Sequence, residues 1–211
     1  CSKQPVPKGN CDIRMRDISY RYGSDTVLSH FSYTFEKGFI YGITAPSGTG
    51  KTTLLNLIGN ILKPAQGEIE TDFKTGIAYV FQEPELLSQL TIAENIALPL
   101  AAYLKKEIAF EQAISILQKM ELDGFENRFP NELSFGQQQR AAIARALTYP
   151  SPLLLMDEPF KGLDEALSRR IIKRIRERQT ENGQTILFTS HNPGELHLFA
   201  DKTVRLDPTS H

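Results

Sequence analysis

The clearest chemistry in the sequence lies in one run between an apolar segment, 39–44, and a segment with helical spacing of apolar residues. The run consists of Ala45, Pro46, Ser47, Gly48, Thr49, Gly50, Lys51, Thr52 and Thr53. In such a turn, successive backbone N–H groups and the start of the following helix converge on phosphate oxygens. Gly48 and Gly50 let the backbone approach a phosphate closely. We expect Lys51 to span the β- and γ-phosphates of ATP and the Thr52 hydroxyl to bind Mg²⁺.

The first position of this run departs from the usual pattern. The strict phosphate-loop pattern, G-x-x-x-x-G-K-[ST], begins with glycine, whereas this sequence has Ala45. Alanine is acceptable there if its φ is negative, so we expect the loop to keep its function with a changed nucleotide affinity. The alternative interpretation is a strand-to-helix turn that binds no ligand.

Two carboxylates follow an apolar strand directly. Residues 153–156 (LLLM) lead into Asp157 and Glu158. Because strand C-terminal ends face the ligand crevice in an open parallel sheet, we expect both acids beside Lys51. Asp157 would hold Mg²⁺ through water, and Glu158 would polarise the attacking water. The alternative is an ordinary strand followed by an acidic turn, which the pairing with Lys51 disfavours.

A second motif narrows the class of nucleotide hydrolase. Leu133-Ser134-Phe135-Gly136-Gln137 is followed by Arg-Ala-x-x-Ala-Arg-Ala from residue 140 and resembles the signature motif of ABC ATPases, usually LSGGQ. The resemblance implies that Ser134, Gly136 and Gln137 contact the ATP held by a partner subunit. Phe135 stands where that motif has its first glycine. A Ser-capped amphipathic helix alone explains the helix but not the motif.

Further family elements appear in the expected order. Tyr22 resembles the aromatic residue that stacks on adenine, with Tyr20 as its rival. Gln82 resembles the glutamine that reaches the metal and the attacking water. In Gly162-Leu163-Asp164, which resembles the D-loop, Asp164 would cross to the partner's site. His191 resembles the switch histidine that contacts the γ-phosphate.

The elements that must position these residues alternate along the chain. Antiparallel strands are predicted over 12–37, with a turn at 22–25, and further strands at 39–44, 77–81, 153–156 and 185–189. Helices are predicted from 51 through 62, near 91–96, over 106–120, from about 134 and over 165–181. Strands alternating with helices predict an α/β fold with a mostly parallel sheet.

The resemblance adds the organisation of the domain. It implies a P-loop NTPase core, an N-terminal antiparallel β subdomain and an inserted α-helical subdomain. We expect a single ABC ATPase domain over 1–211, with a loose lead-in at 1–10. The nucleotide-binding core would comprise 11–83 and 150–211, and the helical subdomain would comprise 84–149.

The composition of the chain limits the kinds of partner and the compartment that we expect for it. The net charge of −1 provides no basic field for nucleic acid, and the charges at 165–181 are mixed and flank an apolar stripe, as on a solvated helix face. Only two cysteines are present, which favours a reducing compartment. No apolar run reaches the ~18 residues that span a bilayer, so we expect any membrane crossing to belong to another polypeptide.

The resemblance therefore implies a second cassette in a homodimer or heterodimer, integral membrane permease subunits and, for an importer, a substrate-binding protein. It implies a cytoplasmic chain at the inner face of the cell membrane. With its segments 90–100 and 156–160, the chain resembles the ATP-binding subunits of bacterial importers of the nitrate, sulfonate and taurine type. It also resembles those of the lipoprotein-releasing and macrolide-export type. Pro159-Phe160 favours the importer. A non-transport ABC ATPase and a module without turnover are the competing interpretations.

Overall fold

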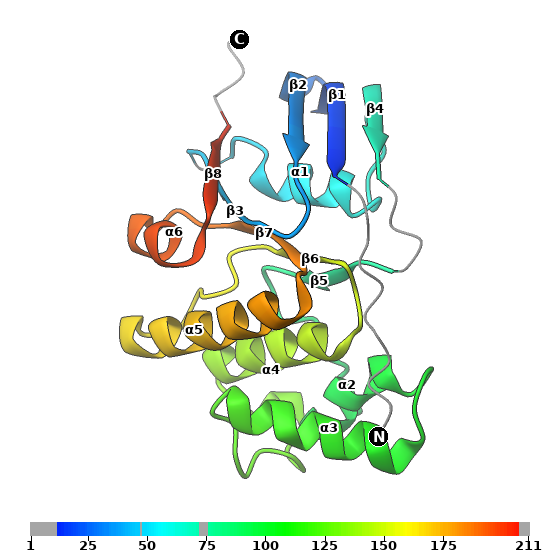
Figure 1. Ribbon diagram of the computed structural model, residues 1–211, viewed down its shortest axis with the longest axis vertical. Coiled ribbons are helices and arrows are strands. Elements are labelled where there is room, and N and C mark those ends of the chain that lie inside the picture. Colours follow the sequence, from blue (N-terminus) through cyan, green and yellow to red (C-terminus); the bar gives the residue numbers. More distant parts are fainter. Residues whose placement is uncertain (1–11, 47, 72–75, 207–211) are drawn as a thin grey trace. The chain divides into compact units, whose positions relative to one another are not determined.

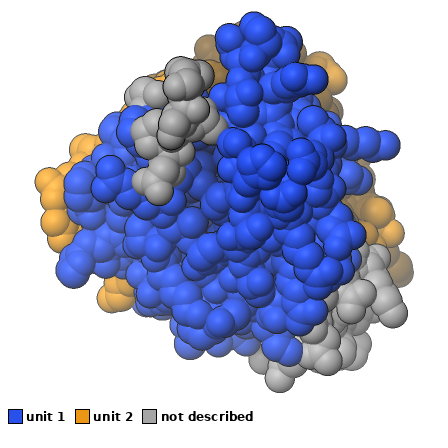
Figure 2. All heavy atoms as spheres, turned by 90° about the horizontal axis from the view of Figure 1, so that it is seen from above, with its two compact units in different colours: residues 1–79, 151–158, 175–211 blue, residues 80–150, 159–174 orange. Residues whose placement is uncertain are grey.

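The computed structural model describes residues 12–46, 48–71 and 76–206 (Figure 1). The chain forms two compact units, which Figure 2 shows in blue and orange. The first comprises 1–79, 151–158 and 175–211, and the second comprises 80–150 and 159–174. Among the described residues, no helix has the length and apolar character needed to cross a membrane.

The first unit begins with an antiparallel sheet in the order β2-β1-β4. Its strands are β1 (Ile13–Tyr22), β2 (Asp25–Phe35) and β4 (Gln66–Glu70). Tyr22 pairs with Asp25 across a two-residue turn in which Gly23 has a φ of 58°, the conformation that such hairpins favour. The predicted hairpin is confirmed. The sequence did not predict β4, because its five residues (QGEIE) show no apolar alternation.

A five-stranded sheet in the order β5-β6-β7-β3-β8 carries the site. Its strands are β3 (Ile40–Thr44), β5 (Ala78–Val80), β6 (Leu153–Met156), β7 (Thr185–Thr189) and β8 (Lys202–Arg205). β3 runs parallel to both β7 and β8, and β6 runs parallel to β7. Every residue of β6 and β7 is buried, as expected for strands covered on both faces. The predicted parallel sheet is confirmed.

Helix α1 (Lys51–Ile58) packs its apolar face into the core of this unit. Leu54 and Leu55 are fully buried there, in one cluster with residues of β1, β3, β6 and β7. The prediction that this helix continues to Leu62 is wrong. Gly59 caps it, and Asn60 then adopts a φ of 57°, which ends the helical geometry. The unit also contains α6 (Pro193–Phe199) and the second half of α5 (Glu165–Asn182).

The second unit is helical. It contains α2 (Ile92–Ala97), the 3-10 turn η1 (Leu98–Leu100), α3 (Lys106–Lys119), the 3-10 turn η2 (Pro130–Glu132), α4 (Phe135–Thr148) and the start of α5. Thr91 and Glu94 form a capping box that starts α2, and Ser134 and Gln137 form another that starts α4. The predicted interruption near Pro99 is confirmed, because η1 replaces the α-helix there.

Candidate functional site

The phosphate loop joins the end of β3 to the start of α1. Gly48 and Gly50 have φ angles of 79° and 87°, which favour glycine. A Cβ at Gly50 would lie only 2.6 Å from Val27 Cγ1, so close packing also requires glycine there. Ser47 lies outside the described residues. Thr49 closes a turn by donating from its backbone N–H to the carbonyl of Pro46 at 3.3 Å.

Ala45 is compatible with this loop. Its φ is not positive, so its Cβ introduces no left-handed strain, and its side chain packs partly buried against the core. Lys51 folds back over the loop and donates from Nζ to the carbonyls of Ala45 at 3.1 Å and Pro46 at 3.4 Å. Both acceptors are neutral carbonyls, so neither compensates the positive charge of the ammonium group.

Asp157 sits at the end of β6 with a side chain that is almost fully buried. Its Oδ2 accepts from the Thr52 hydroxyl at 2.6 Å, and its Oδ1 accepts from the Thr189 hydroxyl at 2.6 Å. The carboxylate is therefore fixed between α1 and β7. Burial raises the pKa of the nearby Tyr79 phenol, and the charge of Asp157 raises that pKa further. Tyr79 stays protonated and donates to Asn56 at 2.9 Å.

Glu158 follows in a left-handed conformation, with a φ of 44°. Its backbone N–H donates to the Thr189 hydroxyl at 2.9 Å, and its Oε1 lies 3.5 Å from His191 Nδ1. The histidine is 73% exposed, on the loop between β7 and α6. That loop is held by Ser190, which donates to Glu195 at 2.5 Å. The structure thus brings Lys51, Thr52, Asp157, Glu158 and His191 together in the first unit.

The donors in this cluster suit Mg²⁺. Thr52 and Asp157 offer a hydroxyl and a carboxylate oxygen 2.6 Å apart, and a hard cation prefers such oxygens. Among residues 12–46, 48–71 and 76–206, no group of three or more acidic, histidine or cysteine side chains forms a metal cage. A magnesium ion that arrives with a nucleotide needs no such cage, because it keeps several waters and the phosphates supply further oxygens.

Tyr22 and Tyr20 differ in exposure. Tyr22 is 52% exposed near the end of β1, whereas Tyr20 packs partly buried against the core. The two rings meet edge to face, with centroids 5.0 Å apart. Only the Tyr22 ring is largely open to solvent, as a ring that stacks on a base must be.

The signature residues lie in the second unit, at the start of α4. The Ser134 hydroxyl accepts from the Gln137 N–H at 3.4 Å, and the Gln137 side chain accepts from the Ser134 N–H at 2.9 Å. A Cβ at Gly136 would lie 2.7 Å from the carbonyl oxygen of Gly162. A Cβ at Gly162 would lie 2.8 Å from the ring of Phe135. The start of α4 therefore packs tightly against the turn before Asp164.

Asp164 accepts from the Leu167 N–H at 2.9 Å and so caps the start of α5. Gln82 lies exposed just after β5, also in the second unit. Two side chains of the second unit anchor the segment after it. Arg145 donates to the carbonyl of Glu85 at 2.8 Å. Asn95 is fully buried and bonds the carbonyls of Leu87, Leu90 and Thr91, at 3.0 Å, 3.1 Å and 3.0 Å.

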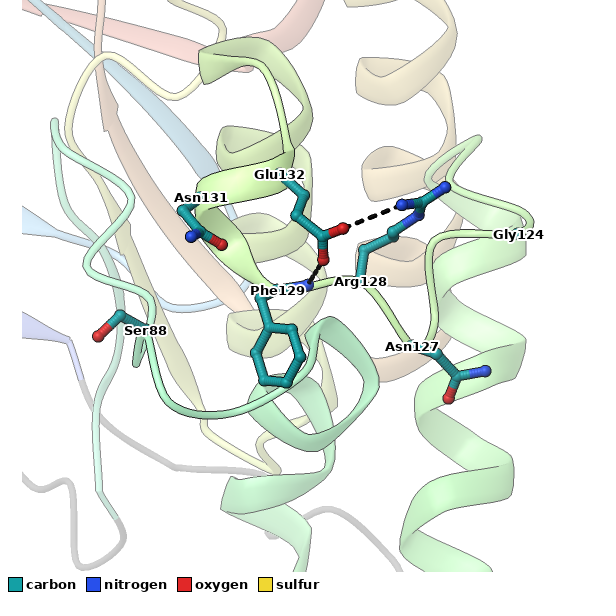
Figure 3. A pocket seen from close by; sticks show the side chains of 7 residues that line it. All are labelled: Ser88, Gly124, Asn127, Arg128, Phe129, Asn131 and Glu132. Atoms are coloured by element: carbon teal, nitrogen blue, oxygen red, sulfur yellow. Dashed lines mark hydrogen bonds and ion pairs between the residues drawn. The ribbon is translucent and has the colours of Figure 1, made fainter.

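A pocket of about 560 Å³ opens next to this segment (Figure 3). It is lined by Ser88, Gly124, Asn127, Arg128, Phe129, Asn131 and Glu132. Figure 3 shows Glu132 between its two partners, the Arg128 guanidinium at 2.9 Å and the Phe129 N–H at 2.7 Å. The Phe129 ring is 42% exposed. The pocket offers an apolar ring beside one ion pair.

A phosphate loop at a strand-to-helix junction, with carboxylates at the end of a parallel strand beside it, defines the class of P-loop nucleotide hydrolases. Comparison with known proteins narrows the class. The family model described as "ABC transporter" matches residues 28–161. A model described as "AAA domain, putative AbiEii toxin, Type IV TA system" matches residues 127–197, less than half of the chain.

Similar proteins and structures agree with the first match. The thiamine import ATP-binding proteins ThiQ of Shigella flexneri and Shigella sonnei are each 36% identical over 202 residues, covering 91% of this chain and 86% of the relative. A dimeric post-hydrolysis structure of the ATP-binding cassette MJ0796 with ADP and Pi has a TM-score of 0.84 at 29% identity, covering 94% and 97% of the two chains. A second dimeric structure of that bacterial ABC transporter cassette has a TM-score of 0.85 at 30% identity, covering 92% and 94%.

The chain belongs to the ABC transporter family. It is an ATPase, the subunit that converts ATP hydrolysis into transport. The family predicted from the signature motif and the phosphate loop is confirmed.

Proposed function

We propose that this chain powers the import of a small solute by hydrolysing ATP between two cassettes. Lys51 and the loop N–H groups would hold the phosphates, and Thr52 and Asp157, with Gln82, would hold Mg²⁺. The bound metal would neutralise the charge on the β- and γ-phosphates. Tyr22 would stack on the adenine ring.

One observation carries this proposal, namely the chain of contacts from Thr52 through Asp157 to Glu158 and His191. Glu158 is only 21% exposed and faces His191 at 3.5 Å. A carboxylate in this place can accept a proton from water as the water attacks the γ-phosphate. His191 would contact the γ-phosphate and orient Glu158. Phosphoryl transfer needs mainly such positioning and charge neutralisation.

The proposal includes a second cassette, since both MJ0796 structures are described as dimeric. Ser134, Gly136 and Gln137 would contact the ATP held by the second chain, and Asp164 would cross to the same site. The start of α4 suits phosphate, because a helix N-terminus attracts anions. Sedimentation of the purified chain with ATP tests whether the second cassette is a copy of this chain.

The membrane-spanning permease would dock on the second unit, at the segment from Gln82 to Leu90 and the pocket of Figure 3. The chain would thereby lie on the cytoplasmic face of the membrane, where ATP is available. The printed names of the relatives describe thiamine import. We propose import for this chain too, with thiamine as the first solute to test and a substrate-binding protein outside the membrane.

The site assignment is tested by steady-state ATP hydrolysis with Mg²⁺. We expect Glu158→Gln to lower kcat by about 100-fold or more, because the base is lost while the shape is kept. Glu70→Gln, an exposed change on β4, is the matched control and should hydrolyse ATP at the wild-type rate. Equal rates for wild type and Glu158→Gln would remove Glu158 from the mechanism.

The direction of transport is tested in proteoliposomes that contain the permease isolated with this chain. Labelled thiamine should accumulate on the side of the membrane that holds the cassettes and ATP. Movement away from that side would show an exporter, and movement of other solutes alone would exclude thiamine.

A further inference from the structure

Thr189, the last residue of β7, makes two contacts that the site residues depend on. Its side chain is fully buried. Its hydroxyl donates to Asp157 Oδ1 at 2.6 Å and accepts from the Glu158 N–H at 2.9 Å. We propose that Thr189 is the positioning residue for both carboxylates, which deepens the proposed function by naming what orients the metal ligand and the base.

The first contact fixes the plane of the Asp157 carboxylate. Rotation about the terminal torsion of an aspartate is soft, so one hydrogen bond leaves its orientation broad. Here Thr52 holds one oxygen from α1 and Thr189 holds the other from β7. The Thr52 hydroxyl must also serve the metal when nucleotide binds. Thr189 is not a proposed metal ligand, so its bond keeps Asp157 oriented both before and after the metal binds.

The second contact holds the backbone turn at Glu158. A φ of 44° is strained for a non-glycine residue, and surrounding contacts must offset this strain. The Glu158 N–H points out of the strand ladder and finds its acceptor in the Thr189 hydroxyl. This bond keeps the turn in the conformation that brings the Glu158 side chain within 3.5 Å of His191.

Apart from these two bonds, the environment of Thr189 does not require a hydroxyl. The preceding residues of β7, Ile186, Leu187 and Phe188, are apolar and fully buried. A valine has nearly the shape of threonine and would fill the same space, but its buried methyl would leave Asp157 Oδ1 and the Glu158 N–H without this partner. The hydroxyl therefore acts through its two bonds.

The test compares Thr189→Val with Thr185→Val and Thr189→Ser. Thr185 is the matched control, because it begins the same strand, is also buried, and its hydroxyl accepts one backbone N–H, that of Gly38, at 2.9 Å. Both valine variants lose a buried hydroxyl, but only Thr189→Val loses hydrogen bonds to Asp157 and Glu158. Thr189→Ser keeps the hydroxyl.

Two measurements are made on the full-length chain. The first is binding of ATP with and without Mg²⁺, which requires no turnover. The second is kcat for ATP hydrolysis. For Thr189→Val we expect the Mg²⁺ concentration at half-saturation to rise about 10-fold and kcat to fall about 10- to 100-fold, as for other residues that orient metal ligands. ATP binding without Mg²⁺ should stay within about twofold of wild type, because the phosphate loop is intact.

Thr185→Val and Thr189→Ser should match wild type in both measurements. Wild-type values for Thr189→Val would overturn the inference, as would an equal loss in Thr185→Val or in Thr189→Ser. Failure of the proposed site looks different. In that case Glu158→Gln would hydrolyse ATP at the wild-type rate, whereas failure of this inference leaves that variant impaired and Thr189→Val indistinguishable from its two comparison variants.

Discussion

Phe135, which stands where the signature motif usually has glycine, packs against Gly162 in the turn before Asp164. A Cβ added at Gly162 would lie 2.8 Å from Cδ1 and 3.3 Å from Cε1 of the Phe135 ring. Lys161 reinforces the contact, with Nζ 5.8 Å from the ring centroid and 3.8 Å from a Glu83 carboxylate oxygen. We expect Gly162→Ala to destabilise the protein through this ring.

The magnitude has two parts. Gly162 has a φ of 79°, so alanine would incur left-handed strain of about 1–2 kcal/mol. The forced contact with Phe135 would add about 1–3 kcal/mol. Gly162→Ala should therefore cost about 2–5 kcal/mol in the wild-type chain. In a Phe135→Ala chain only the strain remains, so the two changes should show a coupling of about 1–3 kcal/mol.

The assay is urea unfolding of wild type, both single variants and the double variant. Gly124→Ala is the control for strain alone, because Gly124 has a φ of 81° and nothing lies within 4 Å of its added Cβ. It should cost about 1–2 kcal/mol with or without Phe135. Additive effects of Phe135→Ala and Gly162→Ala, within about 0.5 kcal/mol, would refute the argument that the ring couples α4 to this turn.

Three further predictions follow from the site and the second unit. Lys51→Ala should abolish ATP hydrolysis, whereas Ala45→Gly should remain active, because the backbone of Ala45 needs no glycine; an active Lys51→Ala chain would overturn the site assignment. Gly50→Ala should also abolish nucleotide binding in a filter assay, since its Cβ would collide with the Val27 side chain; wild-type affinity would contradict this. Glu121→Gln should cost about 1 kcal/mol at pH 7, and progressively less as the pH falls below about 4.3, measured by urea unfolding.

The pH dependence at Glu121 follows from its partners. The carboxylate accepts from Arg170 at 2.8 Å and 3.0 Å, and these bonds lower the pKa of Glu121 against the opposing effect of burial. A lowered folded-state pKa gives stability that is complete above the unfolded-state pKa of about 4.3 and is lost as pH falls through the folded-state pKa. Glu165→Gln, whose ion pair with Arg169 is highly exposed, is the control and should change stability little. A constant difference between wild type and Glu121→Gln from pH 7 to pH 3 would contradict this.

Much of the parallel sheet could be predicted from the sequence, because fully buried strands such as 153–156 and 185–189 appear as continuous apolar runs. The edge strand β5 could also be predicted, as the strand at 77–81, whereas the other edge strand could not. β8 (KTVR) has one buried residue, Val204, and pairs with β3 through a register that only the folded chain defines. The end of α1 was missed because apolar residues continue at helical spacing past Gly59, although the backbone leaves the helix there.

The candidate site likewise contains residues that could be predicted from the sequence and residues that could not. The residues with motif chemistry, from Lys51 to His191, are recognisable by type and spacing. Thr189 and Asn95 are not, because their importance lies in bonds to atoms that the sequence does not place. Thr189 reaches Asp157 across 31 intervening residues, and nothing in β7 distinguishes its hydroxyl from that of Thr185. Asn95 resembles any polar residue in an amphipathic helix until its burial is known.

The central claim is that ATP binding closes a pair of cassettes, and sedimentation of Glu158→Gln tests it most directly. This variant should bind ATP without turning it over. With saturating ATP and Mg²⁺ the purified chain should sediment as a dimer of about twice its 23.7 kDa mass, and with ADP as a monomer. Ser134→Arg in the same background should prevent the dimer by placing a bulky side chain at the start of α4. A monomer at saturating ATP would contradict closure between two copies of this chain.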